Sequence, residues 1–495
     1  MKTKIFRLIL LVTPVLLGSL SSCESFLEKD PQGALTQATF PTSASDALLA
    51  VNATYGTMLD LRFHSGIFPL LDIMSDDARK GRNPTDQSTE IGPYDNFRFT
   101  KTGNELNSWW STLYLGIKRA NVVIGKVPEI QMDEALRKRY IAEARFLRAL
   151  FYFDLVRAWG DVPLVTALNP PVTLKQTPKA DIYKQIEEDL LAAVTDLDER
   201  EKVSEQAGRA LKGSARALLA KVYLFKGDFA NAEKYAKEVI DSKLYGLEPV
   251  FTDANGVAGE HGIESVFEIG AIGLEGPGGN GFANVQGVRG TPNRGWGFNR
   301  PAPDLRASFE AGDPRLKGTI IDLGDVIDGI TIMGDGTTPD ITKDENGKII
   351  ETECYNRKIW TPGTDVPSQF GHNRRIIRYA DVLLMAAEAL NENNKPGDAL
   401  VYLNEVRKRA RQGSPAILPD ITETRKENLR SIILNERRHE LAMEGHRFWD
   451  LVRTGKAAGV LGPLGFIAGK HELFPIPQAE IDISQGNLVQ NPNWN

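Results

Sequence analysis

Residues 217–236, ALLAKVYLFKGDFANAEKYA, place a tight Gly227-Asp228 turn between two segments in which apolar residues recur every three or four positions. Residues 383–406 repeat this design, with Pro396-Gly397-Asp398 at the turn. Small alanines on both sides of each turn let two antiparallel helices pack closely, as in the two-helix unit of tetratricopeptide repeats. The sequence therefore predicts a mainly α fold built on a tetratricopeptide-like helical-repeat scaffold.

Apolar residues at helical spacing also mark segments outside these two pairs. The helix over 136–158 should end at Gly160, because glycine followed by Pro163 is a common helix stop. Ser43 or Thr42 has the side chain of an N-cap for the first helix. We expect further helices at 43–61, 106–124, 136–158, 181–197 and 429–453.

Glycine is distributed unevenly along the chain. Residues 255–371 hold 22 of the 45 glycines, whereas the longer stretch 105–245 holds 6. Such a Gly-rich segment is not expected to be helical, and long loops of this kind are often functional. We therefore predict a helical scaffold at about 43–250 and 372–455, a loop-rich insertion at about 251–371, and an irregular C-terminal segment at 456–495.

Within the insertion, Ile341 and Ile349-Ile350 flank Asn346-Gly347, which predicts a β-hairpin closed by a type I′ turn. A partial match to a calcium-binding loop around Asp344 lacks the first carboxylate, because Thr342 occupies that position. The hairpin is the preferred interpretation, and the insertion is expected to contain short β-hairpins.

The N-terminus has the layout of a secretory signal. Basic residues precede the apolar run Leu8–Leu20, and Leu20-Ser-Ser-Cys23 resembles a bacterial lipobox. This predicts a lipoprotein signal peptide at 1–22, a lipidated tether at 23–42 that begins with the acylated Cys23, and a single body at 43–495.

Charge and cysteine content exclude some function classes. The net charge is −6, and it becomes (59 − 3) − 65 = −9 once the signal peptide leaves with three basic groups. A nucleic-acid binder would show a basic surplus, so no nucleic-acid partner is expected. Two cysteines exclude a disulfide scaffold, and lipidation of Cys23 leaves Cys354 as an unpaired thiol.

Motifs for catalysis, cofactors or metals do not stand out. His439 and His446 lie seven residues apart, whereas a helical zinc motif needs a spacing of four. The same segment places three glutamates at four-residue spacing beside three arginines, which predicts an ion-paired helix face: Glu436, Glu440 and Glu444 with Arg437, Arg438 and Arg447. Adjacent Asp76-Asp77 would point apart in an extended chain, and no other carboxylate pair suggests a glycosidase.

Four aromatic residues lie in Gly-, Pro- or Asn-rich surroundings and not on helical stripes: Trp296, Trp360, Tyr94 and Phe298. A ring face can bind the apolar face of a sugar while neighbouring Arg, Asn and Asp bond its hydroxyls. The run Gly295-Trp-Gly-Phe-Asn-Arg300 combines these residue types. The alternative is that the rings pin the long loop to the body.

An ordered set of short motifs along nearly the whole chain resembles the SusD/RagB family of Bacteroidetes outer-membrane lipoproteins. The motifs are Cys23-Glu-Ser-Phe-Leu27, Arg139–Ala149, Gly160–Leu164, Gly295-Trp-Gly297, Asp313-Pro-Arg315, Ile377–Ala389, Asn435–Leu441, Glu444–Arg447 and Phe474-Pro-Ile-Pro477. The resemblance implies a non-enzymatic, lipid-anchored protein of the cell surface without a cofactor. It implies capture of oligosaccharides and docking as a lid on a SusC-like TonB-dependent transporter.

Peptide capture, as in RagB-like members, and a purely structural lid remain alternatives. The family's ligand sites use rings from an early loop and from the long insertion. Trp296 lies in a recurring motif of the family, whereas Trp360, Tyr94 and Arg79 are assigned by position. The expected ligand-binding residues are Trp296, Trp360, Tyr94, Phe298, Asn299, Arg300, Arg79 and Asp77.

Overall fold

The computed structural model describes residues 40–494 except 172, 203–206, 275–277 and 363–369. The predicted signal peptide and Cys23 lie outside the described residues. Ser43–Asn495 forms one compact unit, to which the following description applies. None of the described helices is long and apolar enough to cross a membrane.

The first half of the unit is a stack of helices. They are α3 (Ala44–Gly56), α6 (Asn104–Lys126), α7 (Glu134–Trp159) and α8 (Lys179–Asp196). Ser43 caps α3 through a capping box with Asp46, in which each side chain bonds the other residue's backbone N–H. Helix α7 ends at Gly160, whose φ of 73° suits glycine. These findings confirm the helices and caps expected here.

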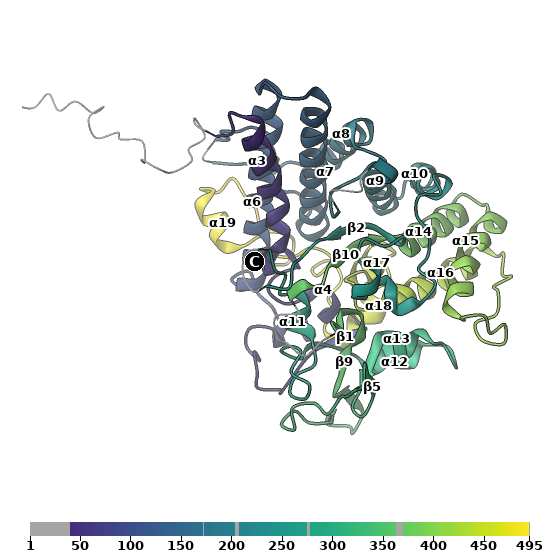
Figure 1. The fold of residues 1–495 in the computed structure, drawn as a ribbon. Coiled ribbons are helices and arrows are strands. Elements are labelled where there is room, and N and C mark those ends of the chain that lie inside the picture. Colours follow the sequence, from purple (N-terminus) through teal and green to yellow (C-terminus); the bar gives the residue numbers. More distant parts are fainter. Residues whose placement is uncertain (1–39, 172, 203–206, 275–277, 363–369, 495) are drawn as a thin grey trace, which may run out of the picture. The chain divides into compact units, whose positions relative to one another are not determined.

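The two helix pairs predicted around tight turns are also present. They are α9 (Lys212–Lys226) with α10 (Phe229–Asp241), and α14 (Tyr379–Glu392) with α15 (Pro396–Ala410). Gly227 closes the first turn in the left-handed conformation, and Ala217 and Ala232 are fully buried. Helix α10 packs on α14, so that Figure 1 shows one continuous arc of helices from α3 to α16. The tetratricopeptide-like scaffold is confirmed.

The prediction of a single helix at 429–453 is wrong. Two helices, α16 (Lys426–Leu441) and α17 (Arg447–Arg453), occupy this segment. The break contains Met443 and Gly445, both with positive φ. There the Gly445 N–H donates to Asp72 and the Glu444 carboxylate pairs with Arg378. Tertiary polar contacts therefore override a helix-compatible sequence.

The C-terminal segment is less irregular than expected. It contains α18 (Ala457–Leu461), a 3₁₀ turn (Gly462–Leu464) and α19 (Gln478–Ile483). Phe474 and Ile476 are fully buried in the main core. The segment therefore completes the scaffold, and the hydrogen bond from the Trp159 indole N–H to the Pro475 carbonyl ties it to α7.

A layer of loops, short helices and two-stranded ribbons lies against the scaffold (Figure 1). The ribbons are β1 (Ala78–Gly81) with β3 (Phe298–Pro301), β2 (Ser265–Ile269) with β10 (Arg374–Arg378), β4 (Ile320–Asp322) with β9 (Cys354–Asn356), β5 (Val326–Ile327) with β6 (Ile330–Thr331), and β7 (Ile341–Lys343) with β8 (Ile349–Thr352). The short helices are α4 (Leu70–Ile73), α5 (Gly92–Asp95), α11 (Phe282–Gln286), α12 (Pro303–Ser308) and α13 (Arg315–Thr319). Because β1 precedes the insertion in sequence, the loop layer is built from two separate parts of the chain.

Single-turn 3₁₀ segments fill the connections. They are Thr57–Leu59, Leu61–Phe63, Val127–Glu129, Arg200–Lys202, Phe251–Ala254, Val257–Gly259 and Arg357–Ile359.

The β7–β8 hairpin is present, but its turn is not of type I′. The Gly347 N–H donates to the Asp344 carbonyl, so Glu345 and Asn346 are the central residues, and the positive φ at this described turn belongs to Gly347. The Asp344 carboxylate accepts from the N–H groups of Asn346 and Lys348 and holds this conformation. The strands then continue past a bulge, which follows from a turn of this length.

The ion-paired face on α16 is confirmed, with partners other than those expected. Glu440, fully buried, contacts Arg378 on β10 and Arg409 on α15, with the Arg378 contact at 2.6 Å. Glu436 pairs with Arg407 on the same helix α15. The arginines of α16 itself turn elsewhere, since Arg437 pairs with Asp381. The network thus joins elements far apart in sequence.

Candidate functional site

The loop that follows α11 presents Trp296 on a closed backbone frame. The Trp296 N–H donates to the Asn284 carbonyl over 2.8 Å, and the Gly297 N–H donates to the Gly287 carbonyl over 3.0 Å. A third bond, from the Arg294 N–H to Val288, spans 2.7 Å. The loop is therefore fixed by its own main chain before any ligand arrives.

Two glycines make this frame possible. A Cβ on Gly295 would lie 2.4 Å from the Asn284 carbonyl oxygen, and one on Gly287 would lie 2.2 Å from the Arg294 carbonyl oxygen. Both distances are far below van der Waals contact. The two strands of the loop can approach this closely only without side chains at these positions.

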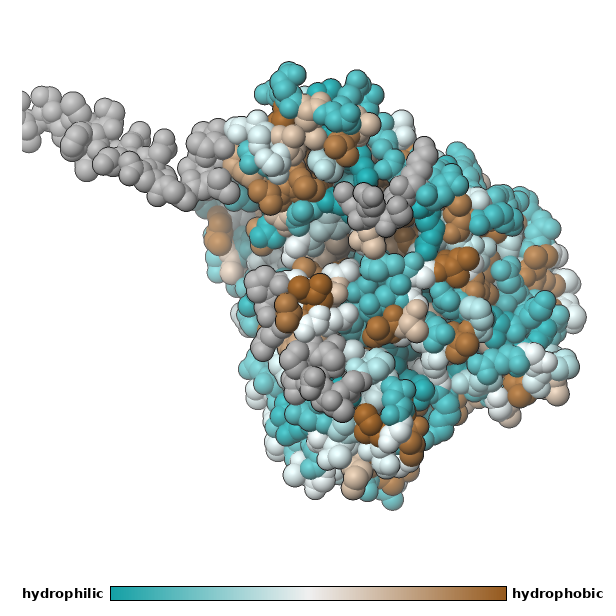
Figure 2. Space-filling model, viewed as in Figure 1, coloured by the Kyte–Doolittle hydropathy of each residue, from teal (hydrophilic) through white to brown (hydrophobic). Residues whose placement is uncertain are grey.

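Trp296 is 41% exposed, whereas most aromatic residues of the chain are buried. Thr291 and Asn293, in the same loop, are also exposed and carry a hydroxyl and an amide. An exposed, rigidly held indole with neighbouring hydrogen-bonding groups can stack on the apolar face of a sugar. Figure 2 shows one face of the molecule as mainly hydrophilic, with apolar residues in small groups.

Two salt bridges hold the base of this loop. Arg289 contacts Asp86 over 3.1 Å and Asp335 over 3.2 Å. Although burial opposes ionisation, hydrogen bonds from the N–H groups of Thr338 and Thr337 lower the pKa of Asp335 to about 2. Asp335 therefore stays ionised at neutral pH and keeps Arg289 in place.

Four of the other predicted site residues lie in the β1–β3 ribbon and Asp77 directly precedes β1, and their side chains contact the protein itself. Phe298, Asn299 and Arg300 are at most 1% exposed, and Arg79 lies opposite Arg300 in the register. The Asp77 carboxylate, also buried, pairs with Arg438 over 2.6 Å. A ligand contact by the buried Phe298, Asn299, Arg300 or Asp77 side chains would require this region to open, whereas Arg79 is half-buried.

The ribbon residues have internal partners. The Asn299 amide donates to Gln286 over 2.8 Å and to Asp72 over 3.1 Å. Arg79 donates to the carbonyls of Ser75 and Ala78. These contacts join the ribbon to α11 and α4, and so position the frame that carries Trp296.

The remaining two rings lie apart from the exposed indole. Tyr94 is 2% exposed and stacks on Phe99 in the main core, with ring centroids 4.9 Å apart. Trp360 is 9% exposed, donates its indole N–H to Asp328 over 2.7 Å, and lies under the Arg294 guanidinium. Both rings pin loops to the body, as the alternative interpretation expected, and Trp296 is the ring in this set with an open face.

Thr291 and Asn293, which are exposed in the same loop as Trp296, are not among the ligand-binding residues predicted from the sequence. The sequence feature that could have indicated them is the run Thr291-Pro-Asn-Arg294, which has the composition of an exposed turn. It directly precedes the motif Gly295-Trp-Gly-Phe-Asn-Arg300. The cis peptide bond before Pro292 lies in this run.

Glu310, Glu436 and His439 are close enough to share a metal ion within the described part of the chain. However, Arg407 contacts both carboxylates, over 2.7 Å each, and Arg315 also binds Glu436. Burial and the nearby Arg315 lower the pKa of His439, so its ring stays neutral. The arginines already neutralise the charge that would attract a cation.

The tetratricopeptide-like scaffold, the loop layer and the rigidly held, exposed indole are together typical of a ligand-binding protein. The model of the SusD family matches residues 264–494, and a model described as starch-binding, associating with the outer membrane, matches residues 73–224. The chain belongs to the SusD family.

Among curated proteins, SusD-like protein P2 of Formosa agariphila is 31% identical, over 97% of this chain and 98% of the relative. Starch-binding protein SusD of Bacteroides thetaiotaomicron is 27% identical over 78% of each chain. The second relative is named as a binding protein and not as an enzyme, in agreement with the prediction that the chain has no catalytic activity.

Two solved structures are similar along most of the chain. A laminarin-binding SusD-like protein is 31% identical with a TM-score of 0.76, covering 92% of this chain and 100% of its own. Surface glycan-binding protein A from Bacteroides thetaiotaomicron, in complex with laminarihexaose, is 27% identical with a TM-score of 0.75, covering 91% and 100%.

Proposed function

We propose that this protein captures oligosaccharides at the Trp296 loop and delivers them to a SusC-like TonB-dependent transporter. The observation that carries the proposal is the exposure of Trp296 on a loop whose backbone is already closed by hydrogen bonds. A rigid platform loses little conformational entropy on binding, which favours capture of a flexible, hydrated sugar chain.

The relatives suggest the substrate class. The 31%-identical structure is named as laminarin-binding and a second was solved with laminarihexaose, whereas the 27%-identical curated relative is named as starch-binding. We therefore propose a neutral glucan, with laminarin-type chains tested first. The expected mature charge of −9 also disfavours a polyanionic glycan.

Calorimetry with laminarihexaose, maltoheptaose and a mixed peptide pool tests this function. We expect binding of one of the two glucans with a dissociation constant in the micromolar-to-millimolar range, and at least a tenfold loss in Trp296→Ala. Val401→Ala, which truncates another exposed apolar side chain on α15, is the matched control and should bind as wild type. Binding of the peptide pool and of neither glucan would overturn the proposal of glycan capture and favour peptide capture.

We also propose that the protein is anchored in the outer membrane, facing the cell surface, through lipid on Cys23. The support is the Leu20-Ser-Ser-Cys23 motif and the match to a family model described as starch-binding, associating with the outer membrane. Cys23→Ser should release the protein from the membrane fraction and leave its glycan affinity unchanged. Co-purification with the transporter from membranes tests the delivery step, and its failure would leave a capture protein without that partner.

A further inference from the structure

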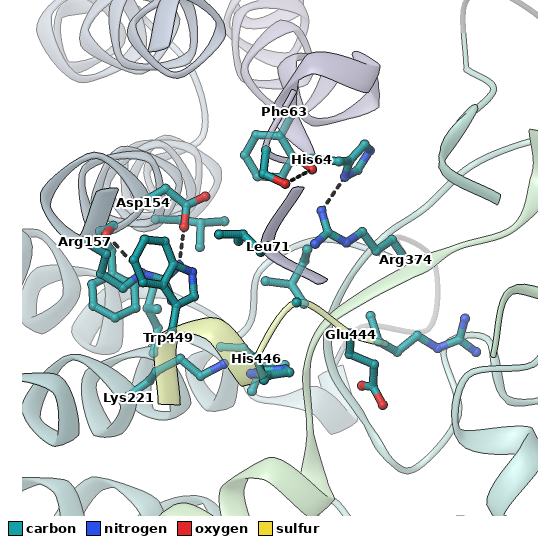
Figure 3. A pocket seen from close by; sticks show the side chains of 18 of the residues that line it. Phe63, His64, Leu71, Asp154, Arg157, Lys221, Arg374, Glu444, His446 and Trp449 are labelled. Carbon is teal, nitrogen blue, oxygen red and sulfur yellow. Dashed lines mark hydrogen bonds and ion pairs between the residues drawn. The ribbon is translucent and has the colours of Figure 1, made fainter. Parts of the chain in front are cut away.

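A cavity of about 70 Å³, which Trp296 does not line, lies where the scaffold meets the loop layer (Figure 3). Its walls come from α4, α6, α7, α9, β10 and α17, and from the loops that begin at Phe63 and at Glu444. A cavity of this volume has room for several water-sized groups, at roughly 10–15 Å³ each. It therefore suits a small polar species and excludes a sugar chain.

The charged side chains around this cavity carry a basic surplus. The basic ones are Arg157, Lys221, Arg374 and Arg375, and the acidic ones are Asp154 and Glu444. Three of the four cations already have carboxylate partners: Arg157 has Asp154, Lys221 has Asp381, and Arg375 has Glu268. The Glu444 carboxylate is bound by Arg378 and Lys358 and points away from Arg374 in Figure 3.

Arg374 is the lining cation that has no carboxylate in salt-bridge contact among the described residues, and Asp72, Asp154 and Glu444 act on it only at longer range. It donates to His64 Nδ1 over 2.5 Å and covers the Phe282 ring at 4.5 Å. Burial and Arg374 itself hold the pKa of His64 well below its ordinary value, so this partner is neutral. Burial lowers the pKa of Arg374 to about 10, which still leaves it charged at neutral pH. In contrast, the buried Arg378 and Arg315 each contact carboxylates.

Two indole N–H groups add donors without acceptors. Trp109 and Trp449 line the cavity and are 1% and 3% exposed, and neither indole nitrogen has a hydrogen-bond partner among the described residues. A buried donor without a hydrogen-bond partner destabilises the folded state. A bound acceptor that reached these nitrogens would remove that cost.

We propose that this cavity is a binding site for a small monovalent anion, such as chloride, held by Arg374, with the indole N–H groups of Trp109 and Trp449 as further donors in the cavity wall. No carboxylate is in salt-bridge contact with Arg374 among the described residues, so its guanidinium can donate directly to one bound anion. The walls also include Leu150 and Phe153, and burial beside apolar side chains penalises a doubly charged, strongly hydrated anion far more than a halide. This site is independent of the glycan site.

Bromide provides a direct test, because it replaces chloride and scatters anomalously. Crystals of the protein grown in sodium bromide should show an anomalous peak inside the cavity, within hydrogen-bond distance of the Arg374 guanidinium. Water without an anomalous peak in this cavity would overturn the proposal, even if bromide occupied surface positions elsewhere.

Thermal unfolding provides the solution test. At constant ionic strength, replacing gluconate by chloride should raise the Tm by about 2 °C or more, because the anion binds the folded state alone. Arg374→Met and Trp449→Phe should lose this response, and Trp449→Phe keeps the ring in case Arg374→Met does not fold. Arg425→Met, which removes a cation whose side chain is 79% exposed, should keep it. An equal response in all four proteins, or none in the wild type, would refute the site.

Discussion

The Trp296 backbone N–H lies 2.8 Å from the Asn284 carbonyl oxygen, and this bond joins the exposed indole to helix α11. The same carbonyl would lie 2.4 Å from a Cβ on Gly295. The orientation of the ring therefore depends on a residue that has no side chain.

Gly295→Ala should displace the Trp296 loop without unfolding the scaffold. The added methyl group must push the Asn284 carbonyl away, so we expect at least a tenfold loss of glycan affinity by calorimetry and near-native far-UV circular dichroism. Gly397→Ala is the matched control, because a Cβ there meets no atom within 4 Å and the residue lies in the first turn of α15. Native affinity in Gly295→Ala would show that the loop adapts and that the frame does not fix the ring.

Trp360→Phe separates a structural ring from a ligand-binding ring. The change removes the hydrogen bond to Asp328 and part of the contact with Arg294, so we expect a loss of about 1–2 kcal/mol in the free energy of unfolding. Glycan affinity should stay within twofold of wild type, because the ring is 9% exposed. A large affinity loss with unchanged stability would restore Trp360 to the ligand site.

The sequence predicted the scaffold well because its signals are local. Apolar spacing and caps such as Ser43 and Gly160 place α3 and α7 within a few residues of the structure. The same spacing could not reveal the break at Gly445, because that break depends on Asp72 and Arg378, which lie far away in the chain.

The site was less predictable for the same reason. Trp296 and Phe298 share one Gly-rich motif, yet the first is 41% and the second 1% exposed. What separates them is the pairing of β3 with β1, two segments more than two hundred residues apart. A ring in a loop looks the same in sequence whether the loop packs inward or outward.

Glu440→Gln should be strongly destabilising. Its carboxylate is fully buried and contacts Arg378, Arg409 and Arg315, so neutralising it leaves buried guanidinium groups uncompensated. We expect a loss of about 3–5 kcal/mol in the free energy of unfolding, measured by urea titration. Glu427→Gln, on the same helix but 77% exposed, is the control and should change stability by less than about 0.5 kcal/mol. Similar small losses in both variants would mean that the network is not coupled to folding.

Carboxylates with opposite pKa shifts predict that stability is greatest near pH 4. Although burial opposes it, Arg378 and Lys358 lower the pKa of Glu444 to about 2, so its contribution is complete above its ordinary value near 4.5 and is lost as pH falls toward 2. Burial raises the pKa of Asp95 to about 7 and that of Asp72 to about 6, so their contribution is complete below their ordinary value near 3.8 and is lost progressively as pH rises from there through 6 to 7. Urea unfolding between pH 2.5 and 8 should therefore show a maximum of stability near pH 4 and a decline from there to pH 7.

Two variants test which carboxylates cause the loss of stability on the acid side and on the basic side of this maximum. Asp95→Asn keeps an acceptor for the Lys80 N–H, which Asp95 binds over 2.9 Å, and removes the group that must ionise while buried. Its stability should therefore fall less between pH 5 and 8 than that of wild type, with the acid side unchanged. Glu444→Gln should be less stable at pH 5 and should lose less of its remaining stability on acidification. A wild-type profile that is flat from pH 5 to 8 would show that Asp95 and Asp72 ionise without cost, and that burial does not control their pKa values.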